Sequence, residues 1–186
     1  MKKLVVLLLL ITAAGCQKEK FIEYQKPTGT ISDMSGYDGL ESEQFYDITV
    51  DEILEKIENR ETFIVYFGYE GCPWCICVVP VLHQVSVEKE MPIYYLNFKN
   101  TINSENVEGM KKISEICGND QEGLEEGQFS FFFPTVLYIK KGETYKVHIG
   151  TVSGHNGFTD PLSEKQKERL AYQYNKEFEG LLIIEK

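Results

Sequence analysis

The stretch GCPWCICVVP, residues 71–80, places three cysteines within six residues: Cys72, Cys75 and Cys77. Thiols at this spacing can form a redox pair, bind a metal ion or act as small packing residues. The chemistry depends on ionisation, because the thiolate is the nucleophile and a free cysteine has a pKa of about 8.5. The structure around Cys72 therefore decides between these uses.

Pro73 favours a helix that begins immediately after Cys72, because proline fits the first helical position, where a missing N–H costs nothing. A Cys72 thiolate at this helix start would accept hydrogen bonds from free N–H groups and lie at the positive end of the helix. Cysteines placed in this way have pKa values of about 3.5–7.5. We therefore predict that Cys72 is the attacking thiolate. Cys75, nearly one turn further along the same face, is then the resolving thiol.

Cys77 lies two residues beyond Cys75, which rotates it by about 200° around the helix and away from the redox pair. Three thiolates in this arrangement do not converge on a tetrahedral metal ion, so we predict neither a metal nor another cofactor. We expect Cys77 and Cys117 to be buried packing residues. A disulfide between Cys77 and Cys117 is the alternative.

The surrounding pattern alternates helices and strands. A helix over 50–59, capped by Thr49, leads into a dense apolar strand over 62–67. The cysteine helix, which Pro80 should kink, precedes a strand over 92–98 and a helix over 106–117 that ends at Gly118. Two strands, 135–140 and 144–151, then form a hairpin, and Ser163 and Gln166 begin a helix to about residue 178. This order predicts an α/β fold with a mixed central sheet and helices on both faces.

These features together resemble the thioredoxin superfamily. The resemblance is carried by the strand before Cys72, the Cys72-Pro73-Trp74-Cys75 helix start, the kinking Pro80, and Phe133-Pro134 before a strand and a Lys-Gly turn. It covers about residues 46–178. It implies a thioredoxin-like three-layer sandwich and thiol–disulfide oxidoreductase activity. It also implies a cis peptide bond at Pro134 facing the two sulfurs, with Phe133 beside a bound client.

Two positions depart from the thioredoxin pattern. Tyr66 stands where thioredoxins carry a buried acid, and Gly71 stands where they carry a tryptophan. Without the carboxylate, the proton of Cys75 must pass to water or to another group such as the Tyr66 hydroxyl. Trp74, inside the motif, either contacts the substrate, which we favour, or covers the site. The direction of electron flow stays open.

The N-terminus has the order of an export signal: Lys2 and Lys3, an apolar run over 4–11, and small residues. Ala13-Ala14-Gly15-Cys16 resembles the lipobox of bacterial lipoproteins. We predict a signal peptide over 1–15, a lipidated Cys16 on a membrane's outer surface, a polar tether over 16–44 and a thioredoxin-like domain over 45–186. Plain secretory cleavage is the alternative to lipidation.

The acidic composition argues against nucleic acid as a partner. The formal net charge is −10, and loss of Lys2 and Lys3 with the signal peptide would make it −12. We predict an extracytoplasmic, lipid-anchored oxidoreductase that acts on exported cysteine-containing proteins or peptides and is recycled by an unidentified redox partner. The chain also resembles the bacteriocin transport accessory proteins of Gram-positive bacteria. The alternative function is therefore a non-catalytic accessory or binding protein for a secretion or bacteriocin export system.

Overall fold

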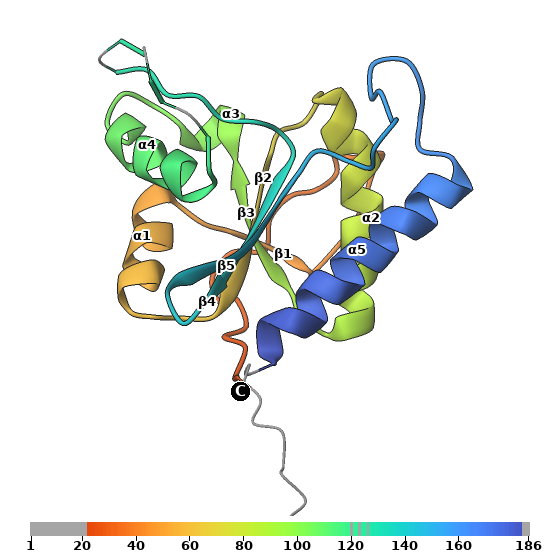
Figure 1. Ribbon diagram of the computed structural model, residues 1–186, viewed down its shortest axis with the longest axis horizontal. Coiled ribbons are helices and arrows are strands. Elements are labelled where there is room, and N and C mark those ends of the chain that lie inside the picture. Colours follow the sequence, from red (N-terminus) through yellow and green to blue (C-terminus); the bar gives the residue numbers. More distant parts are fainter. Residues whose placement is uncertain (1–21, 120, 123, 126, 184–186) are drawn as a thin grey trace, which may run out of the picture.

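The computed structural model describes residues 22–119, 121–122, 124–125 and 127–183, which form a central sheet covered by helices on both faces (Figure 1). In chain order the elements are β1 (Phe45–Asp47), α1 (Val50–Glu58), β2 (Phe63–Gly68), α2 (Pro73–Lys89), β3 (Ile93–Asn97), α3 (Phe98–Thr101), α4 (Val107–Ile116), β4 (Thr135–Lys140), β5 (Glu143–Ile149) and α5 (Glu164–Leu182).

The sheet of the described residues has five strands in the order β1-β3-β2-β4-β5. Strands β1, β3 and β2 are parallel, whereas β4 is antiparallel to β2 and β5 is antiparallel to β4. Parallel neighbours require crossover connections, which α1 and α2 supply, and the β4–β5 hairpin supplies the antiparallel edge. The predicted α/β class, a thioredoxin-like three-layer sandwich with a mixed sheet, is confirmed.

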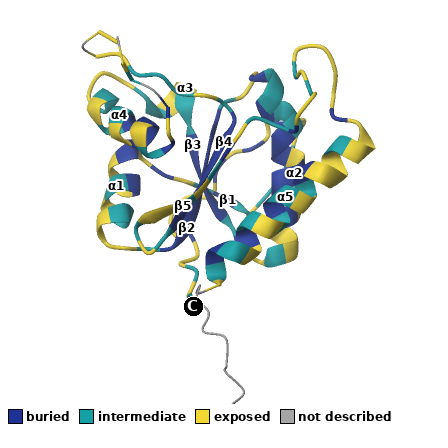
Figure 2. Cartoon of the chain, viewed as in Figure 1, coloured by how far each residue is buried: buried dark blue, intermediate teal, exposed yellow. Residues whose placement is uncertain are grey.

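Alternation along β2 builds two cores, one on each face of the sheet. Phe63, Val65 and Phe67 pack with α1 and α4, whereas Ile64 and Tyr66 pack with α2 and α5. All six residues of β2 are buried, and Figure 2 shows the central strands as a buried layer between half-exposed helices, whereas the edge strand β5 is largely exposed. A strand buried on both faces explains the unbroken apolar run in its sequence.

The two predicted helix starts are confirmed as capping boxes. The Glu52 N–H donates to the Thr49 hydroxyl at 3.3 Å, and the Thr49 N–H donates to the Glu52 carboxylate at 2.8 Å. Ser163 and Gln166 form the same reciprocal pair at the start of α5. Helix α5 continues to Leu182, past the predicted end at residue 178, because Leu181 extends its buried face.

Two short elements were not predicted, the three-residue strand β1 and the four-residue helix α3. Both are shorter than the runs from which periodicity can be recognised. Strand β1 forms by pairing with β3, so it depends on a distant part of the chain. Helix α3 begins at Asn97, whose side chain accepts from the Lys99 N–H at 3.2 Å.

Residues 22–44 were predicted to belong to a polar tether over 16–44, but in the structure they pack against the domain. Met34 and Tyr37 are buried in the α2-side core, and Ile31 forms a bridge with Tyr46. The Ile22 N–H donates to the Leu182 carbonyl at 2.9 Å. The folded unit therefore includes residues 22–44, and the domain boundary predicted at residue 45 is wrong. The predicted signal peptide and Cys16 lie outside the described residues.

The β4–β5 turn brings the backbone at Gly142 close to the α1–β2 connection. Lys141 and Gly142 both have positive φ values, 53° and 77°, as a two-residue hairpin turn requires. The Gly142 N–H donates to the Glu61 carbonyl at 2.9 Å. A Cβ at this position would clash with the Ile57 carbonyl oxygen, so the turn needs glycine for both its conformation and its space.

Candidate redox site

The connection from β2 to α2 places Cys72 at the first turn of the helix, as predicted. Cys72 is the N-cap of α2 and Pro73 is its first residue. The Cys75 N–H donates to the Cys72 sulfur at 3.3 Å. The Cys72 N–H donates to the Tyr69 carbonyl at 3.2 Å, which fixes the connecting loop. Gly71, with φ at 82°, supplies the left-handed conformation that the loop needs to reach the helix.

The two sulfurs of the pair differ in their ionisation. A hydrogen bond from the Cys75 thiol, together with the N–H groups of Cys75 and Trp74, lowers the pKa of Cys72 to about 7. The same pairing with Cys72, and then burial, raises the pKa of Cys75. Proton loss therefore occurs first at Cys72, and Cys75 keeps its proton in the dithiol state.

We expect alkylation of Cys72 by iodoacetamide to accelerate with pH around a midpoint near 7, because only the thiolate reacts. Ionisation increases as pH rises through the pKa, so the lowered pKa of Cys72 brings reactivity to lower pH. At pH 6 the thiolate fraction would be about thirtyfold that of a free thiol whose pKa is about 8.5. Timed alkylation, acid quenching and peptide fragmentation in a mass spectrometer would measure the rate at each cysteine.

Cys77 provides the internal control for this titration. Burial raises the pKa of Cys77, although its side chain is partly exposed. Its alkylation should therefore reach half of its maximal rate at a higher pH than that of Cys72. Equal midpoints for Cys72 and Cys77 would show that the start of α2 does not activate Cys72.

The face of α2 that bears Cys75 packs into the hydrophobic core. Cys75, Val78, Val79 and Leu82 are all fully buried, which confirms the predicted shared face. Pro80 lies within α2 on the exposed side. Cys72 itself is only 2% exposed. The pair therefore lies at the edge of the core, where burial discourages a second charge.

The Phe133–Pro134 peptide bond is cis, as predicted. Strand β4 pairs with β2 so that Thr135 lies opposite Phe67. This register puts Phe133 and Pro134 at the carboxyl end of β2, where the loop to Cys72 begins. The Phe133 ring lies 5.4 Å from the Tyr69 ring, in an edge-to-face arrangement. The residues predicted to contact a client therefore lie at the same end of the sheet as the two cysteines.

Trp74 packs against the loop between β5 and α5. Its ring lies 4.2 Å from the Phe158 ring, edge to face, and a Cβ added at Gly157 would lie 2.8 Å from Trp74 Cγ. Phe158 remains 71% exposed. The Trp74 ring packs on this loop and so covers part of the site. It also stays partly exposed, which leaves it accessible to a substrate. Phe158 was not predicted as part of the site.

A group of aromatic side chains beside Phe133 was also missed. Phe98, Phe129, Phe131 and Phe133 line a surface hollow of about 380 Å³, and the neighbouring Phe132 is 57% exposed. The available sequence signal was the run FSFFFP over 129–134. Within this run, only Phe133 and Pro134 were predicted to be site residues. The exposed part of the run extends the apolar surface at this end of the sheet.

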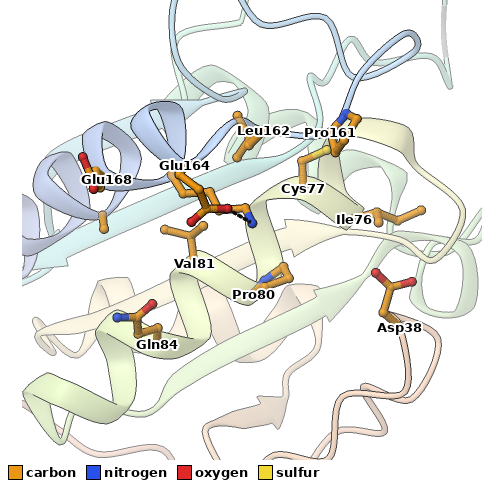
Figure 3. Close-up of a pocket in the computed structure, with 12 residues that line it drawn as sticks. Asp38, Ile76, Cys77, Pro80, Val81, Gln84, Pro161, Leu162, Glu164 and Glu168 are labelled. Atoms are coloured by element: carbon orange, nitrogen blue, oxygen red, sulfur yellow. Dashed lines mark hydrogen bonds and ion pairs between the residues drawn. The ribbon is translucent and has the colours of Figure 1, made fainter.

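Cys77 faces away from the pair, as predicted, but it is partly exposed rather than buried. Figure 3 shows it beside Pro161 and Leu162, at a hollow of about 540 Å³ between α2 and the start of α5. Cys117 is buried in the core on the opposite face of the sheet. All four cysteines of the described residues are free, and the alternative Cys77–Cys117 disulfide is wrong because the sheet separates them.

Metal ligands and membrane-spanning helices were considered for the described part of the chain. No cluster of three or more histidine, cysteine, aspartate or glutamate side chains there has an arrangement suited to a metal ion. Nor does any helix in those residues combine the length and hydrophobicity that a membrane span requires.

Comparisons with solved structures find thioredoxins that are similar to this chain. No family model matches the sequence. Thioredoxin O2 from Arabidopsis thaliana, in its oxidized state, is 15% identical with a TM-score of 0.40, and the match covers 70% of this chain and 95% of that one. Thioredoxin from Aeropyrum pernix is 20% identical with a TM-score of 0.41, covering 66% and 82%. Malassezia sympodialis thioredoxin (Mala s 13) is 14% identical with a TM-score of 0.40, covering 71% and 94%. These distant likenesses carry no conclusion about activity.

Proposed function

We propose that this protein is a thiol–disulfide oxidoreductase that uses Cys72 as nucleophile and Cys75 as resolving thiol. The supporting observation is the pair itself, in which Cys72 caps α2 and accepts a hydrogen bond from the Cys75 N–H at 3.3 Å. The opposite pKa shifts of the two thiols match these separate roles.

The exchange proceeds in two displacements. The Cys72 thiolate attacks one sulfur of a client disulfide, forming a Cys72–client bond while the other client sulfur leaves with the electron pair. Cys75 then loses its proton and attacks Cys72. The Cys72–Cys75 bond forms, the second client sulfur leaves, and the client disulfide has been reduced by two electrons. Oxidation of a client dithiol follows the reverse path.

The client is proposed to lie between two aromatic groups. Phe133, with Pro134, contributes the surface near β4, and Trp74 with Phe158 contributes the surface near α5. In Figure 1 the segment before β4 runs over the α4 side of the sheet, and the loop after β5 runs over the α5 side. A client segment with apolar side chains near its cysteine fits such a setting.

Export and lipidation belong to the same proposal. The charged start, the apolar run and Ala13-Ala14-Gly15-Cys16 support an extracytoplasmic protein anchored through a lipid on Cys16. Its clients would be exported cysteine-containing proteins or peptides, and a separate redox partner would recycle it. Mass spectrometry of the mature protein from membranes tests this part. An unmodified N-terminus in a soluble fraction would contradict it.

The reduction potential of the pair tests the enzymatic proposal. Trp74 is the only tryptophan of the chain and lies between the two cysteines, so its fluorescence can follow their oxidation in redox buffers. Catalytic pairs have potentials of about −270 to −120 mV, whereas structural disulfides lie below about −300 mV. We expect a value in the catalytic range, together with reduction of insulin by dithiothreitol at an increased rate. A reduction potential in the range of structural disulfides, together with no acceleration of insulin reduction, would favour the alternative of a non-catalytic accessory protein.

A further inference from the structure

Tyr66 occupies the centre of the sheet directly beneath the redox helix. It lies in β2 on the face covered by α2, and its side chain is 0% exposed. Strand register places Tyr66 beside Tyr95 of β3, and the two rings stack with centroids 5.3 Å apart and planes 19° apart. The ring is therefore held firmly by its neighbours.

The Tyr66 hydroxyl is buried without a fixed partner. Among the described residues it makes no hydrogen bond of normal geometry. A Cβ at Gly68 would overlap this hydroxyl, so glycine leaves the space that the group occupies. A buried hydroxyl without a partner is unfavourable, so its retention at this position calls for an explanation. After burial, Cys75 and Tyr37 have the largest electrostatic effects on this hydroxyl, so both groups lie near it.

Two further tyrosine hydroxyls lie between Tyr66 and the protein surface. The Tyr37 and Tyr95 hydroxyls are 2.9 Å apart and share a hydrogen bond. Tyr95 and Glu70 both line a polar surface cavity of about 540 Å³ near the ends of β1 and β3. The Glu70 carboxyl group lies so close to Gly36 that a Cβ there would overlap it. The hydrogen-bonded Tyr37 and Tyr95 hydroxyls therefore lie between the surroundings of Tyr66 and a cavity at the protein surface.

We infer that Tyr66, Tyr37 and Tyr95 form a hydroxyl relay that carries the proton of Cys75 to this polar cavity during resolution. The inference rests on the proposed exchange reaction. As Cys75 attacks Cys72, its proton passes to the Tyr66 oxygen while Tyr66 gives its own proton to Tyr37. Tyr37 passes one on to Tyr95, and Tyr95 releases one to water in the cavity. The leaving client sulfur keeps the electron pair of the broken disulfide.

The relay keeps every tyrosine neutral before and after the transfer. Burial raises the pKa values of Tyr66, Tyr37 and Tyr95 well above the ordinary value near 10, so a tyrosinate is not a usable intermediate. A hydroxyl, however, can accept one proton while donating another. The other titratable groups that act on these three tyrosines and the pair are Cys77 from α2, Tyr69 and Glu70 from the loop before α2, and Tyr174 from α5.

Tyr66→Phe tests the relay, because it removes the hydroxyl and keeps the stacked ring. The full chain carrying Cys16→Ser and Cys77→Ser is reduced and mixed with one equivalent of 5,5′-dithiobis(2-nitrobenzoate). Attack by Cys72 releases one coloured thiolate, and closure by Cys75 releases the second. Stopped-flow absorbance from pH 5 to 9 separates these phases. We expect Tyr66→Phe to leave the first phase within about twofold and to slow the second at least about tenfold near pH 7. The difference in second-phase rate between Tyr66→Phe and the protein with Tyr66 should become smaller at pH 9, where hydroxide can remove the proton of Cys75.

Tyr138→Phe is the matched control. Tyr138 is equally buried on the same face of the sheet, and its hydroxyl also lacks a fixed hydrogen bond among the described residues. It lies in β4 and interacts with Glu177 and Tyr174 rather than with the cysteines. Both phases should stay within about twofold in this variant. A second phase that is unchanged in Tyr66→Phe, or equally slowed in Tyr138→Phe, would overturn the relay alone. A wild-type first phase no faster than that of Cys72→Ser would overturn the proposed exchange reaction itself.

Discussion

Cys72→Ser is expected to abolish disulfide exchange, and Cys75→Ser is expected to accumulate a covalent adduct with a client. Serine at position 72 cannot supply a thiolate, so the insulin-reduction rate should fall to that of dithiothreitol alone. In Cys75→Ser the Cys72 thiolate still attacks, but no thiol follows to break the new bond. Acid quenching followed by non-reducing electrophoresis would show the adduct as a band that dithiothreitol removes.

Cys77→Ser provides the control for this pair of variants, because Cys77 is a thiol of the same helix that points away from the pair. We expect it to reduce insulin at the wild-type rate and to trap nothing. Trapping by Cys72→Ser as efficient as by Cys75→Ser would reverse the assigned order of attack. Failure of Cys75→Ser to trap any reactive disulfide would show that Cys72 is not a nucleophile.

Gly142→Ala is expected to lower the free energy of unfolding by about 3–4 kcal/mol, the combined cost of a left-handed alanine and a steric clash. An alanine with positive φ costs about 1–2 kcal/mol by itself. Here its Cβ would also clash with the Ile57 carbonyl oxygen and lie 2.9 Å from the Arg60 Cα, so the hairpin must move away from the α1–β2 connection. That movement would strain the hydrogen bond from the Gly142 N–H to Glu61. Urea denaturation of the reduced protein measures the loss.

Gly118→Ala separates the conformational cost from the steric one. Gly118 follows α4 with φ at 78°, and a Cβ there would have no atom within 4 Å. Its replacement should therefore cost only about 1–2 kcal/mol. Equal losses for Gly118→Ala and Gly142→Ala would mean that the close approach of the two turns contributes nothing to stability.

Helix starts and turns that depend on residues close together in the sequence could be predicted from it. Thr49 with Glu52 begins one helix, and Pro73 begins another immediately after Cys72, because capping depends on residues within one turn. The turn at Gly142 also follows from local backbone preference. The positions of the pair and of the cis bond at Pro134 were therefore accessible before any tertiary structure was known, the latter through family resemblance.

Features made by distant contacts could not be predicted. Tyr37 lies in a polar stretch without periodicity, and only the fold brings its hydroxyl to Tyr95 and Tyr66. Phe158 lies in a loop whose path to Trp74 leaves no trace in local patterns. Strand β1 is too short for alternation to reveal it, and pairing with β3 defines it. The cysteines of the candidate site were thus predictable, whereas the aromatic residues around them and the proposed proton path were not.

The packing of residues 22–44 determines which way the redox pair would face on a membrane. Ile22 is fixed near the end of α5, and Gln25 donates its N–H to Thr62 at the start of β2, whereas Cys72 follows the other end of that strand. The chain from Cys16 to Ile22 can span at most about 20 Å. A lipid on Cys16 would therefore hold the domain close to the bilayer with the cysteines on its outward end. In that orientation the redox pair would face away from the membrane, towards exported clients that have already left its surface.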